Sequence, residues 1–240
     1  MAKKTASTKE AGETRTSLPL TARSVDLLIS FYYIIFIFTV SFTDLHNFTA
    51  SVLRVEVKDL ENMDLAYPPK FLTDLYFKWA RTVDPLLYEN PMWWQAIEWV
   101  NLLVLTPYAL LAVIGFPLGW RWLRNPGMIV SSFTAYSLAA IIPATLFGND
   151  PTPNPHVFCW VYIPYAIFPL LIILRLWGER PFETKLSGFA STIIWLVGTV
   201  TLALFFTYCL KWFVVYEPGM LPSEVLDVVK GPMDQLPGGL

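Results

Sequence analysis

The apolar residues of this chain fall into five long runs separated by polar segments. Each run approaches the roughly 20 residues that an α-helix needs to cross the hydrocarbon core of a bilayer. In lipid only helices and closed barrels satisfy the backbone, and uninterrupted apolar runs of this length indicate helices rather than strands. The sequence therefore predicts an all-α polytopic membrane protein with helices at about 25–43, 95–118, 126–147, 157–176 and 187–215.

The composition agrees with this interpretation and excludes several classes of function. Of the 240 residues, 55% are hydrophobic and 15% are charged, which is below the quarter that soluble domains carry. A net charge of −2 leaves no basic surplus for a nucleic-acid partner. Cys159 and Cys209 lie in apolar runs and are expected to be buried small hydrophobes. His46 and His156 lie in expected loops without a second ligand at useful spacing, so we expect no metal site and no cofactor.

The distribution of lysine and arginine predicts the orientation of the helices. Basic residues gather in residues 1–24 and in the loops after the second and fourth runs, whereas the loop 148–155 has none. By the positive-inside rule the basic segments face the cytosol. Residues 1–24 are expected to form a disordered cytosolic tail, and residues 216–240 a flexible tail on the luminal side. We therefore expect a cytosolic N-terminus and a C-terminus on the opposite side, which is the lumen if the membrane is an internal one such as the endoplasmic reticulum.

The polar segment 45–93 has features of its own on the predicted luminal side. Apolar residues of 70–82 recur on one helical face, which predicts an amphipathic helix lying in the membrane interface. Asn47 begins an Asn-Phe-Thr glycosylation sequon close to the membrane, and use of this sequon is the less favoured interpretation. Asp84 precedes a proline and is expected to have a structural role at a turn or a helix start.

Two acidic residues lie where the chain otherwise favours lipid. Asp44 ends the first run and Glu98 follows the start of the second, so both fall in the luminal half of the membrane. A charge at the bilayer centre costs roughly 2.5–3.5 kcal/mol on insertion scales, and such residues usually face the bundle interior. Ser137, Tyr162 and Tyr165 are expected at a similar depth. We therefore predict an intramembrane pocket in which the two carboxyl groups meet.

Two carboxyl groups in one dry site cannot both ionise cheaply, so we expect them to share a proton. The anion could hold a cationic amine, and the neutral partner could protonate an alkene or hydrogen-bond to a hydroxyl. Simpler interpretations stay open at this stage. Asp44 could lie in the headgroup layer, Glu98 could be a structural hydrogen-bonding acid, and the tyrosines could be packing residues. Asp26 lies beside Arg23, and an interfacial ion pair is expected there.

Several stretches together resemble the EXPERA-domain family, and in particular its sigma-2 receptor branch. They are FTDL at the end of the first run, KWARTVDPLLYENPMWWQAIEWV, GWRWLRNPGMI and VYIPYAIFPLLII. The resemblance covers residues 25–178 and implies four helices around an intramembrane pocket, to which 187–215 adds a fifth, C-terminal transmembrane helix. It also implies that the pocket acids are Asp44 and Glu98 and that the loop aspartate is Asp84. The other ligand-binding positions that it implies are Asn101, Tyr162, Tyr165 and a polar position that maps to Ser137 or Ala140, of which we take Ser137 as the candidate.

The same resemblance leaves two functions open. The sterol Δ8–Δ7 isomerase branch of the family has a His and a Glu one turn apart on the corresponding helix. Here Val40 stands one turn before Asp44, so that chemistry does not carry over intact. We therefore expect a protein that binds a sterol-like or polycyclic isoprenoid ligand and acts in lipid handling. The alternative is an isomerase or cyclase with Asp44 and Glu98 as the catalytic pair. The expected partners are this hydrophobic ligand and membrane lipids, with a homodimer left open.

Overall fold

The computed structural model describes residues 17–63, 65, 67–217 and 219, and these residues form helices and loops without a β-strand. The predicted all-α fold class is thereby confirmed. The α-helices are α1 (Val25–Phe42), α2 (Asp44–Leu53), α3 (Lys70–Thr82), α4 (Pro85–Glu89), α5 (Met92–Val100), α6 (Thr106–Leu118), α7 (Arg124–Phe147), α8 (Pro155–Leu176) and α9 (Gly188–Tyr216). Shorter turns are the 3-10 helices η1 (Leu20–Arg23), η2 (Val57–Asn62) and η4 (Arg121–Leu123), and the π-helical turn η3 (Asn101–Leu105).

Within the described part of the chain, five helical segments are long and apolar enough to cross a membrane, which confirms the predicted polytopic membrane protein. They are Val25–Leu53, Met92–Leu118, Arg121–Phe147, Pro155–Leu176 and Gly188–Tyr216. The first segment is longer than expected because α2 follows α1 with only Thr43 between them. The backbone of Thr43 is itself helical (φ −96°, ψ −64°), so the chain continues as a helix past the predicted end.

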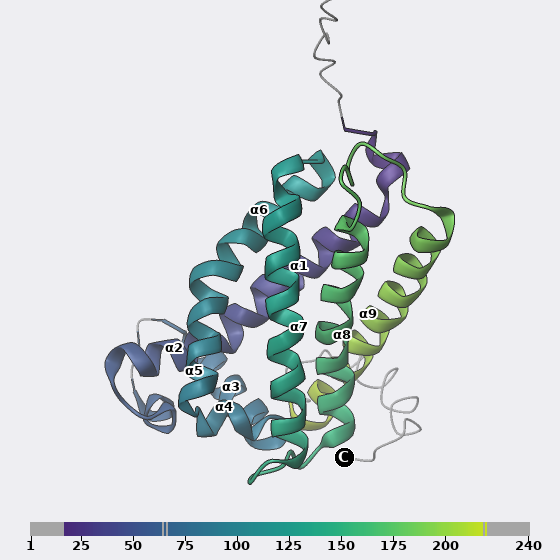
Figure 1. Cartoon of the computed structure of the whole chain (residues 1–240). Helices are drawn as coiled ribbons and strands as arrows, with labels where there is room; N and C mark the ends of the chain where they lie inside the picture. Colours follow the sequence, from purple (N-terminus) through teal and green to yellow (C-terminus); the bar gives the residue numbers. More distant parts are fainter. Residues whose placement is uncertain (1–16, 64, 66, 218, 220–240) are drawn as a thin grey trace, which may run out of the picture.

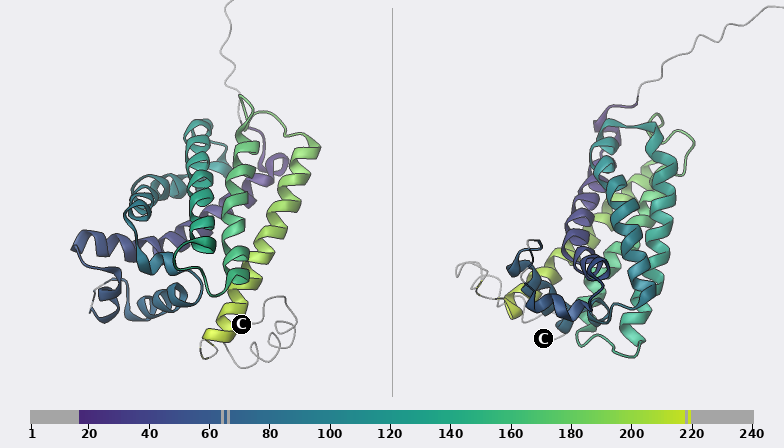
Figure 2. Two further views of the ribbon diagram at one scale, coloured as in Figure 1. Left: turned by 60° about the horizontal axis from the view of Figure 1, so that its bottom comes forward. Right: turned by 90° about the vertical axis from the view of Figure 1, so that its left-hand side faces the viewer.

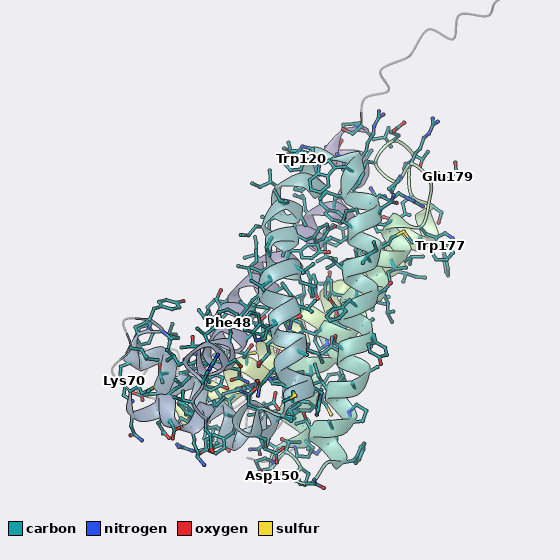
Figure 3. All side chains as sticks on the ribbon, turned by 60° about the vertical axis from the view of Figure 1, so that its left-hand side comes forward. Phe48, Lys70, Trp120, Asp150, Trp177 and Glu179 are labelled. Atoms are coloured by element: carbon teal, nitrogen blue, oxygen red, sulfur yellow. The ribbon has the colours of Figure 1, made fainter. Side chains whose placement is uncertain are left out.

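The long helices form one bundle with a group of short helices at one end. In Figure 1, α6, α7 and α8 stand side by side, α9 leans along α8, and α1 crosses behind them at a slant. α1 packs against α6, and α8 packs against both α7 and α9. The short helices α2 to α5 gather at the end remote from residue 17 (Figure 2). Figure 3 marks the two ends, with Trp120, Trp177 and Glu179 at one and Lys70 and Asp150 at the other.

The segment predicted to lie in the membrane interface forms α3, but its apolar face packs against the protein. Tyr76, Phe77 and Trp79 are buried. The Trp79 ring lies 5.2 Å from that of Trp212 in α9. Phe71, which the sequence places on the same apolar face, is 59% exposed. The amphipathic pattern was therefore interpreted correctly as a helix, but protein contacts bury most of its apolar face.

A buried cluster of charges joins three helices at the other end of the bundle. Asp26 in α1 accepts hydrogen bonds from Arg175 in α8 at 2.6 and 3.0 Å, and another from Arg23. Arg23 also donates to the carbonyl groups of Phe116 and Pro117, at the end of α6, at 3.0 and 3.1 Å. All three charged residues are at most 4% exposed. The expected interfacial Arg23–Asp26 pair is thus a buried cluster, because Arg175 supplies a second cation.

The same cluster orders the end of the predicted N-terminal tail. Residues 17–24 pack against the bundle, and the Leu18 amide donates to the Phe182 carbonyl at 2.9 Å. This differs from the disordered segment expected over 1–24, because Arg23 is anchored inside the protein. Residues 1–16, and almost all of the predicted flexible tail at 216–240, lie outside the described residues.

Candidate functional site

A largely apolar cavity of about 220 Å³ lies among α1, α7, α8 and α9, and side chains from α3 and α5 also line it. Its wall is rich in aromatic residues, including Trp79, Trp94 and Trp212. A few polar side chains interrupt this wall, as is typical of small-molecule sites. Five of the predicted ligand-binding residues are among them: Asp44, Asn101, Ser137, Tyr162 and Tyr165. Their role in binding a ligand stays a prediction.

Asp44 is the carboxylate of the cavity wall. It stands in the first turn of α2, directly after the helical link through Thr43. The residue is 5% exposed. Its oxygens accept hydrogen bonds from Thr43 Oγ1 and from Asn101 Nδ2, each at 2.6 Å. Asp44 is therefore buried and held in place, rather than lying free in the headgroup layer.

A π-helical turn positions Asn101 toward Asp44. Pro107 lacks an N–H group, and its ring crowds the carbonyl of the residue four positions earlier. The chain adapts by widening to the π-helical turn η3, in which the Thr106 amide donates to the Asn101 carbonyl. Turns of this kind occur frequently at functional sites. The same turn separates α5, which carries Glu98, from α6.

Glu98 lies behind the cavity wall rather than in it. The residue is fully buried. By distance and angle, neither carboxyl oxygen makes a hydrogen bond among the described residues, although the Trp94 indole and the Asn47 side chain are close enough to interact with the acid. Glu98 and Asp44 are close enough to interact electrostatically, but no hydrogen bond joins them. The predicted meeting of the two acids within one pocket therefore stays unconfirmed.

Tyr162 connects the cavity to the loop aspartate. Its hydroxyl group donates to Asp84, and the Thr145 hydroxyl lies 3.5 Å from the same carboxylate. Asp84 precedes Pro85, the first residue of α4, as expected of a helix start. It is also fully buried, and desolvation raises the pKa of its carboxyl group to about 6 despite the hydrogen bond from Tyr162. Asp84 thus fixes α4 to α7 and α8 in addition to starting a helix.

The other two predicted residues face the cavity with their hydroxyl groups already engaged. Tyr165 Oη lies 2.7 Å from Thr39 Oγ1 in α1. Ser137 donates to the Phe133 carbonyl of its own helix at 3.0 Å. Asp44 and Asn101 therefore supply the most strongly polar groups at this wall.

The sequence did not predict the contribution of α9. Phe205, Cys209, Trp212 and Phe213 from this helix line the cavity. The Trp212 indole also donates to Thr82 Oγ1 at 2.9 Å. An apolar run of this kind shows that a helix crosses the membrane, but it does not show which of its faces meets a cavity. Cys209 was expected to be a buried hydrophobe and is in fact partly exposed to this space.

Two residues assigned to a loop are buried in α2. His46 is fully buried and stacks on the Tyr76 ring with centroids 4.3 Å apart. Asn47, the sequon residue, is also fully buried. Its amide donates to the Leu87 carbonyl at 3.2 Å and accepts a hydrogen bond from Tyr76. The loop assignment was wrong because α2 extends the first helix, and the packed sequon has no exposed amide to modify.

Comparison with known proteins gives one family and one group of relatives. Residues 70–176 match the family described as EBP, EXPERA (EXPanded EBP superfamily). The chain is 27% identical to sigma intracellular receptor 2 of Macaca fascicularis over 170 residues, 65% of this chain and 89% of the relative. Its identity to the Homo sapiens protein is 27% over 169 residues, with the same coverage of both chains. Its identity to the Xenopus tropicalis protein is 27% over 120 residues, which cover 45% of this chain and 70% of the relative.

These similarities confirm the resemblance predicted from the sequence motifs. The family match covers α3 to α8 and stops before α9. No solved structure gives a significant match.

Proposed function

We propose that this protein binds a sterol-like or polycyclic isoprenoid ligand inside the membrane and acts in the handling of that lipid. The observation that carries the proposal is the cavity, in which apolar walls surround one carboxylate, Asp44, held by Asn101. The similarity to sigma intracellular receptor 2 supports a receptor-like role, because it extends over most of that protein's length.

The polar groups decide the affinity of such a ligand. A molecule that arrives from the bilayer leaves surroundings as apolar as the cavity wall, so apolar burial by itself contributes little. Close packing on aromatic rings and hydrogen bonds to buried groups must therefore supply most of the binding free energy. The walls formed by Trp79, Trp212 and Phe205 suit a flat ring system. The carboxylate of Asp44 suits a cationic amine or a hydroxyl group.

Glu98 would keep the charge of this site low. A buried carboxylate without a hydrogen-bonding partner is very costly in its ionised form. We propose that Asp44 and Glu98 together carry one negative charge and one proton, since two ionised acids would repel each other. Under this proposal Asp44, with its two donors, holds the charge that faces the ligand.

An isomerase or cyclase is the second candidate, and the unpartnered acid favours it. A neutral carboxylic acid that makes no other hydrogen bond is suited to protonate an alkene. An acid catalyst must also reach the proton acceptor within about 2.6–3.2 Å. Glu98 does not line the cavity, whereas Asp44 does. The geometry therefore supports binding better than catalysis by the pair.

Two substitutions separate these functions. The probe is a 3β-hydroxysteroid with a tertiary amine at the end of its side chain, followed by the fluorescence of the cavity tryptophans. Asp44→Asn should weaken binding about 10- to 100-fold, because a charge-assisted hydrogen bond contributes about 1.5–3 kcal/mol. Glu98→Gln should weaken it only a few-fold, since a neutral amide resembles the protonated acid.

A control variant and the result expected of an enzyme complete this test. Asp74→Asn changes an exposed acid on α3 and should leave binding unchanged. An enzyme would instead lose turnover of sterol alkenes with Glu98→Gln, as followed by mass spectrometry, while its affinity for the probe stayed the same. Binding by Asp44→Asn as tight as by the wild type would overturn the proposed site.

We propose the endoplasmic reticulum as the membrane, with the N-terminus in the cytosol and the C-terminus in the lumen. Support for the orientation comes from the end of the bundle that holds the charge cluster. There Arg124 donates to carbonyls of Trp177 and Gly178, and Arg121 pairs with Glu183. The basic segments that the positive-inside rule assigns to the cytosol thus meet at one end.

A further inference from the structure

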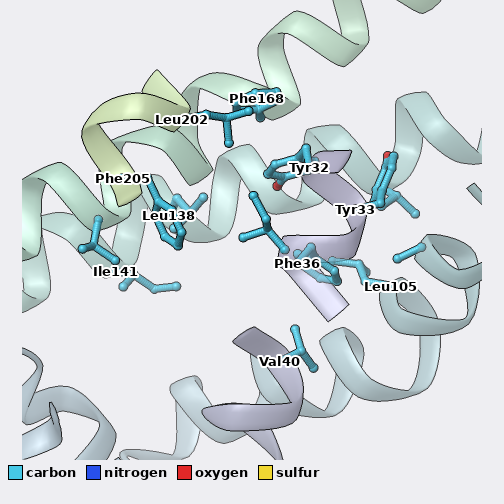
Figure 4. Packing of buried hydrophobic residues seen from close by; sticks show 14 of the residues in the cluster. Tyr32, Tyr33, Phe36, Val40, Leu105, Leu138, Ile141, Phe168, Leu202 and Phe205 are labelled. Atoms are coloured by element: carbon cyan, nitrogen blue, oxygen red, sulfur yellow. The ribbon is translucent and has the colours of Figure 1, made fainter. Parts of the chain in front are cut away.

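A second, smaller cavity adjoins the first, and its wall carries two hydroxyl groups without partners. It has a volume of about 10 Å³ and lies between α1, α7 and α8. Tyr33 from α1 and Ser131 from α7 line it, and each residue is 2% exposed. By distance and angle, neither Tyr33 Oη nor Ser131 Oγ makes a hydrogen bond among the described residues, although the two side chains are close enough to interact and Tyr33 is also close to the Tyr108 side chain. Figure 4 shows Tyr33 near Phe36 in the packed interior of the bundle.

The lack of partners for these hydroxyl groups calls for an explanation. Leaving a buried hydroxyl group unpaired costs about 1–3 kcal/mol, and native proteins keep few such groups. The small cavity has room for about one water-sized group, and its two hydroxyl groups could bond to an oxygen there. The space therefore suits a single oxygen atom supplied from outside the protein chain.

The small cavity and the large cavity share part of their walls. Phe36 and Thr134 line both cavities. Rotation of the Phe36 ring would therefore join the two spaces. The larger cavity, at about 220 Å³, is smaller than the roughly 300–1,000 Å³ of usual ligand sites. A polycyclic ligand needs more length, and the Tyr33–Ser131 end offers it.

The two polar ends of the joined space are well separated. Tyr33 and Asp44 are eleven residue steps apart along the continuous helical path of α1 and α2. At 1.5 Å of rise per residue this corresponds to about 16 Å. The space between them is lined mainly by apolar and aromatic groups such as Phe36 and Val40. The joined site thus has the dimensions of an elongated apolar molecule with a polar group at each end.

We propose that Tyr33 and Ser131 form a polar subsite for a hydroxyl or carbonyl oxygen at the end of the ligand remote from Asp44. This inference rests on the proposed function, and it narrows the ligand to elongated polycyclic molecules with hydrogen-bonding groups at both ends. Tyr33 donates to the oxygen, and Ser131 either donates to it or accepts from it. The Phe36 ring turns aside when the ligand enters.

A matched pair of probes tests the subsite. One is the 3β-hydroxysteroid amine described above, and the other is the same molecule without its 3-hydroxyl group. The amine meets Asp44, so the two probes differ only at the subsite. Wild-type protein should bind the hydroxylated probe about 10-fold more tightly, a difference of about 1.4 kcal/mol. In the double variant Tyr33→Phe with Ser131→Ala this ratio should fall below about 2-fold, while the deoxy probe keeps its affinity.

The controls distinguish this inference from the proposed function. Ser30→Ala removes another buried hydroxyl of α1, one that bonds to the Asp26 carbonyl and lines neither cavity, so the ratio should stay near 10-fold. If Asp44→Asn weakens both probes but the double variant keeps the wild-type ratio, an ordered water fills the small cavity and the subsite is wrong. If neither probe binds wild-type protein, the proposed function fails and the subsite fails with it. Melting temperatures close to that of the wild type establish that each variant is folded.

Discussion

Asp84 shows how one buried side chain outside the membrane spans can make stability depend on pH. It lies in the segment between the first and second spans, where Tyr162 and Thr145 surround its carboxylate. The sequence indicated a helix start from the Asp-Pro pair. It could not indicate the burial, which arises only when α4 folds back onto α7 and α8. That burial raises the pKa of Asp84 to about 6 in the folded protein.

The pKa of Asp84 predicts the direction of the pH dependence. The folded protein binds the proton with a pKa of about 6, above the ordinary aspartate value of 3.8. The buried, ionised carboxylate of Asp84 therefore reduces the stability of the fold most above pH 6. Stability rises as the pH falls from 6 to 4 and the group takes up its proton. The full difference is about 3 kcal/mol, from about 1.4 kcal/mol for each pKa unit. The melting temperature in detergent between pH 4 and 7.5 measures it.

Substitution isolates this contribution from the other acids. Asp84→Asn keeps an oxygen that can accept from Tyr162 but cannot ionise, so the pH dependence between 4 and 6 should become flatter. Asp74→Asn, on the exposed face of α3, should leave the wild-type profile unchanged. A profile for Asp84→Asn as steep as that of the wild type would show that other groups cause the effect.

At the scale of elements, α9 is more than an added helix, because it forms one wall of the cavity. Its end is fixed to the short helices, because Lys78 in α3 donates to the Tyr216 carbonyl and pairs with Glu217 at 2.5 Å. At its other half Gly198 lets α9 approach α1 closely, since a Cβ there would lie 2.6 Å from Leu28 Cδ2. Ligand binding should therefore protect residues of α9.

The two cysteines of the chain provide an internal comparison for α9. Cys209 lines the cavity, whereas Cys159 in α8 is partly exposed but lines no described cavity. The hydroxylated steroid amine should slow modification of Cys209 by N-ethylmaleimide about 5-fold or more, with little effect on Cys159. Peptide mass spectrometry measures both rates in one sample. Equal rates for Cys209 with and without bound probe would place α9 outside the site.

The membrane spans were predictable from the sequence, but the face of each helix that meets the cavity was not. Apolar length predicts a helix in lipid whatever its neighbours are, so all five spans were found. The meeting of Asp44 with Asn101 depends on the π-helical turn that Pro107 requires, and hydropathy does not detect such a turn. The cavity wall from α9 depends on how the helices pack. Residue types therefore predicted the polar groups of the site, and tertiary structure alone assigned their partners.

At the scale of the whole molecule, the two ends of the helical bundle differ in structure. The charge cluster closes one end, and the short helices α2 to α5 cover the other. Removing one member of a buried ion cluster leaves an uncompensated charge, at a cost of about 3–5 kcal/mol. Asp26→Asn leaves both Arg23 and Arg175 without their anion, so this substitution should lower the melting temperature strongly.

A control separates this effect from the loss of an ordinary ion pair. Glu56→Gln breaks the exposed pair with Lys58 and should change the melting temperature little. Thermal unfolding of both variants in the same detergent gives the comparison. Asp26→Asn with a melting temperature equal to that of Glu56→Gln would show that the cluster contributes no more than a surface pair.

The burial of Asn47 has a consequence for how the chain is made. The tyrosine that covers its amide, Tyr76, comes 29 residues later in the sequence. A ribosome therefore delivers the sequon before the residue that hides it. In the proposed orientation, sugar transfer in the lumen competes with the packing of α3 and α4 around the Asn47 side chain, whose oxygen accepts from Tyr76 and whose nitrogen donates to the Leu87 carbonyl. A glycan on Asn47 would mark a molecule that had failed to pack, and mature molecules would carry none.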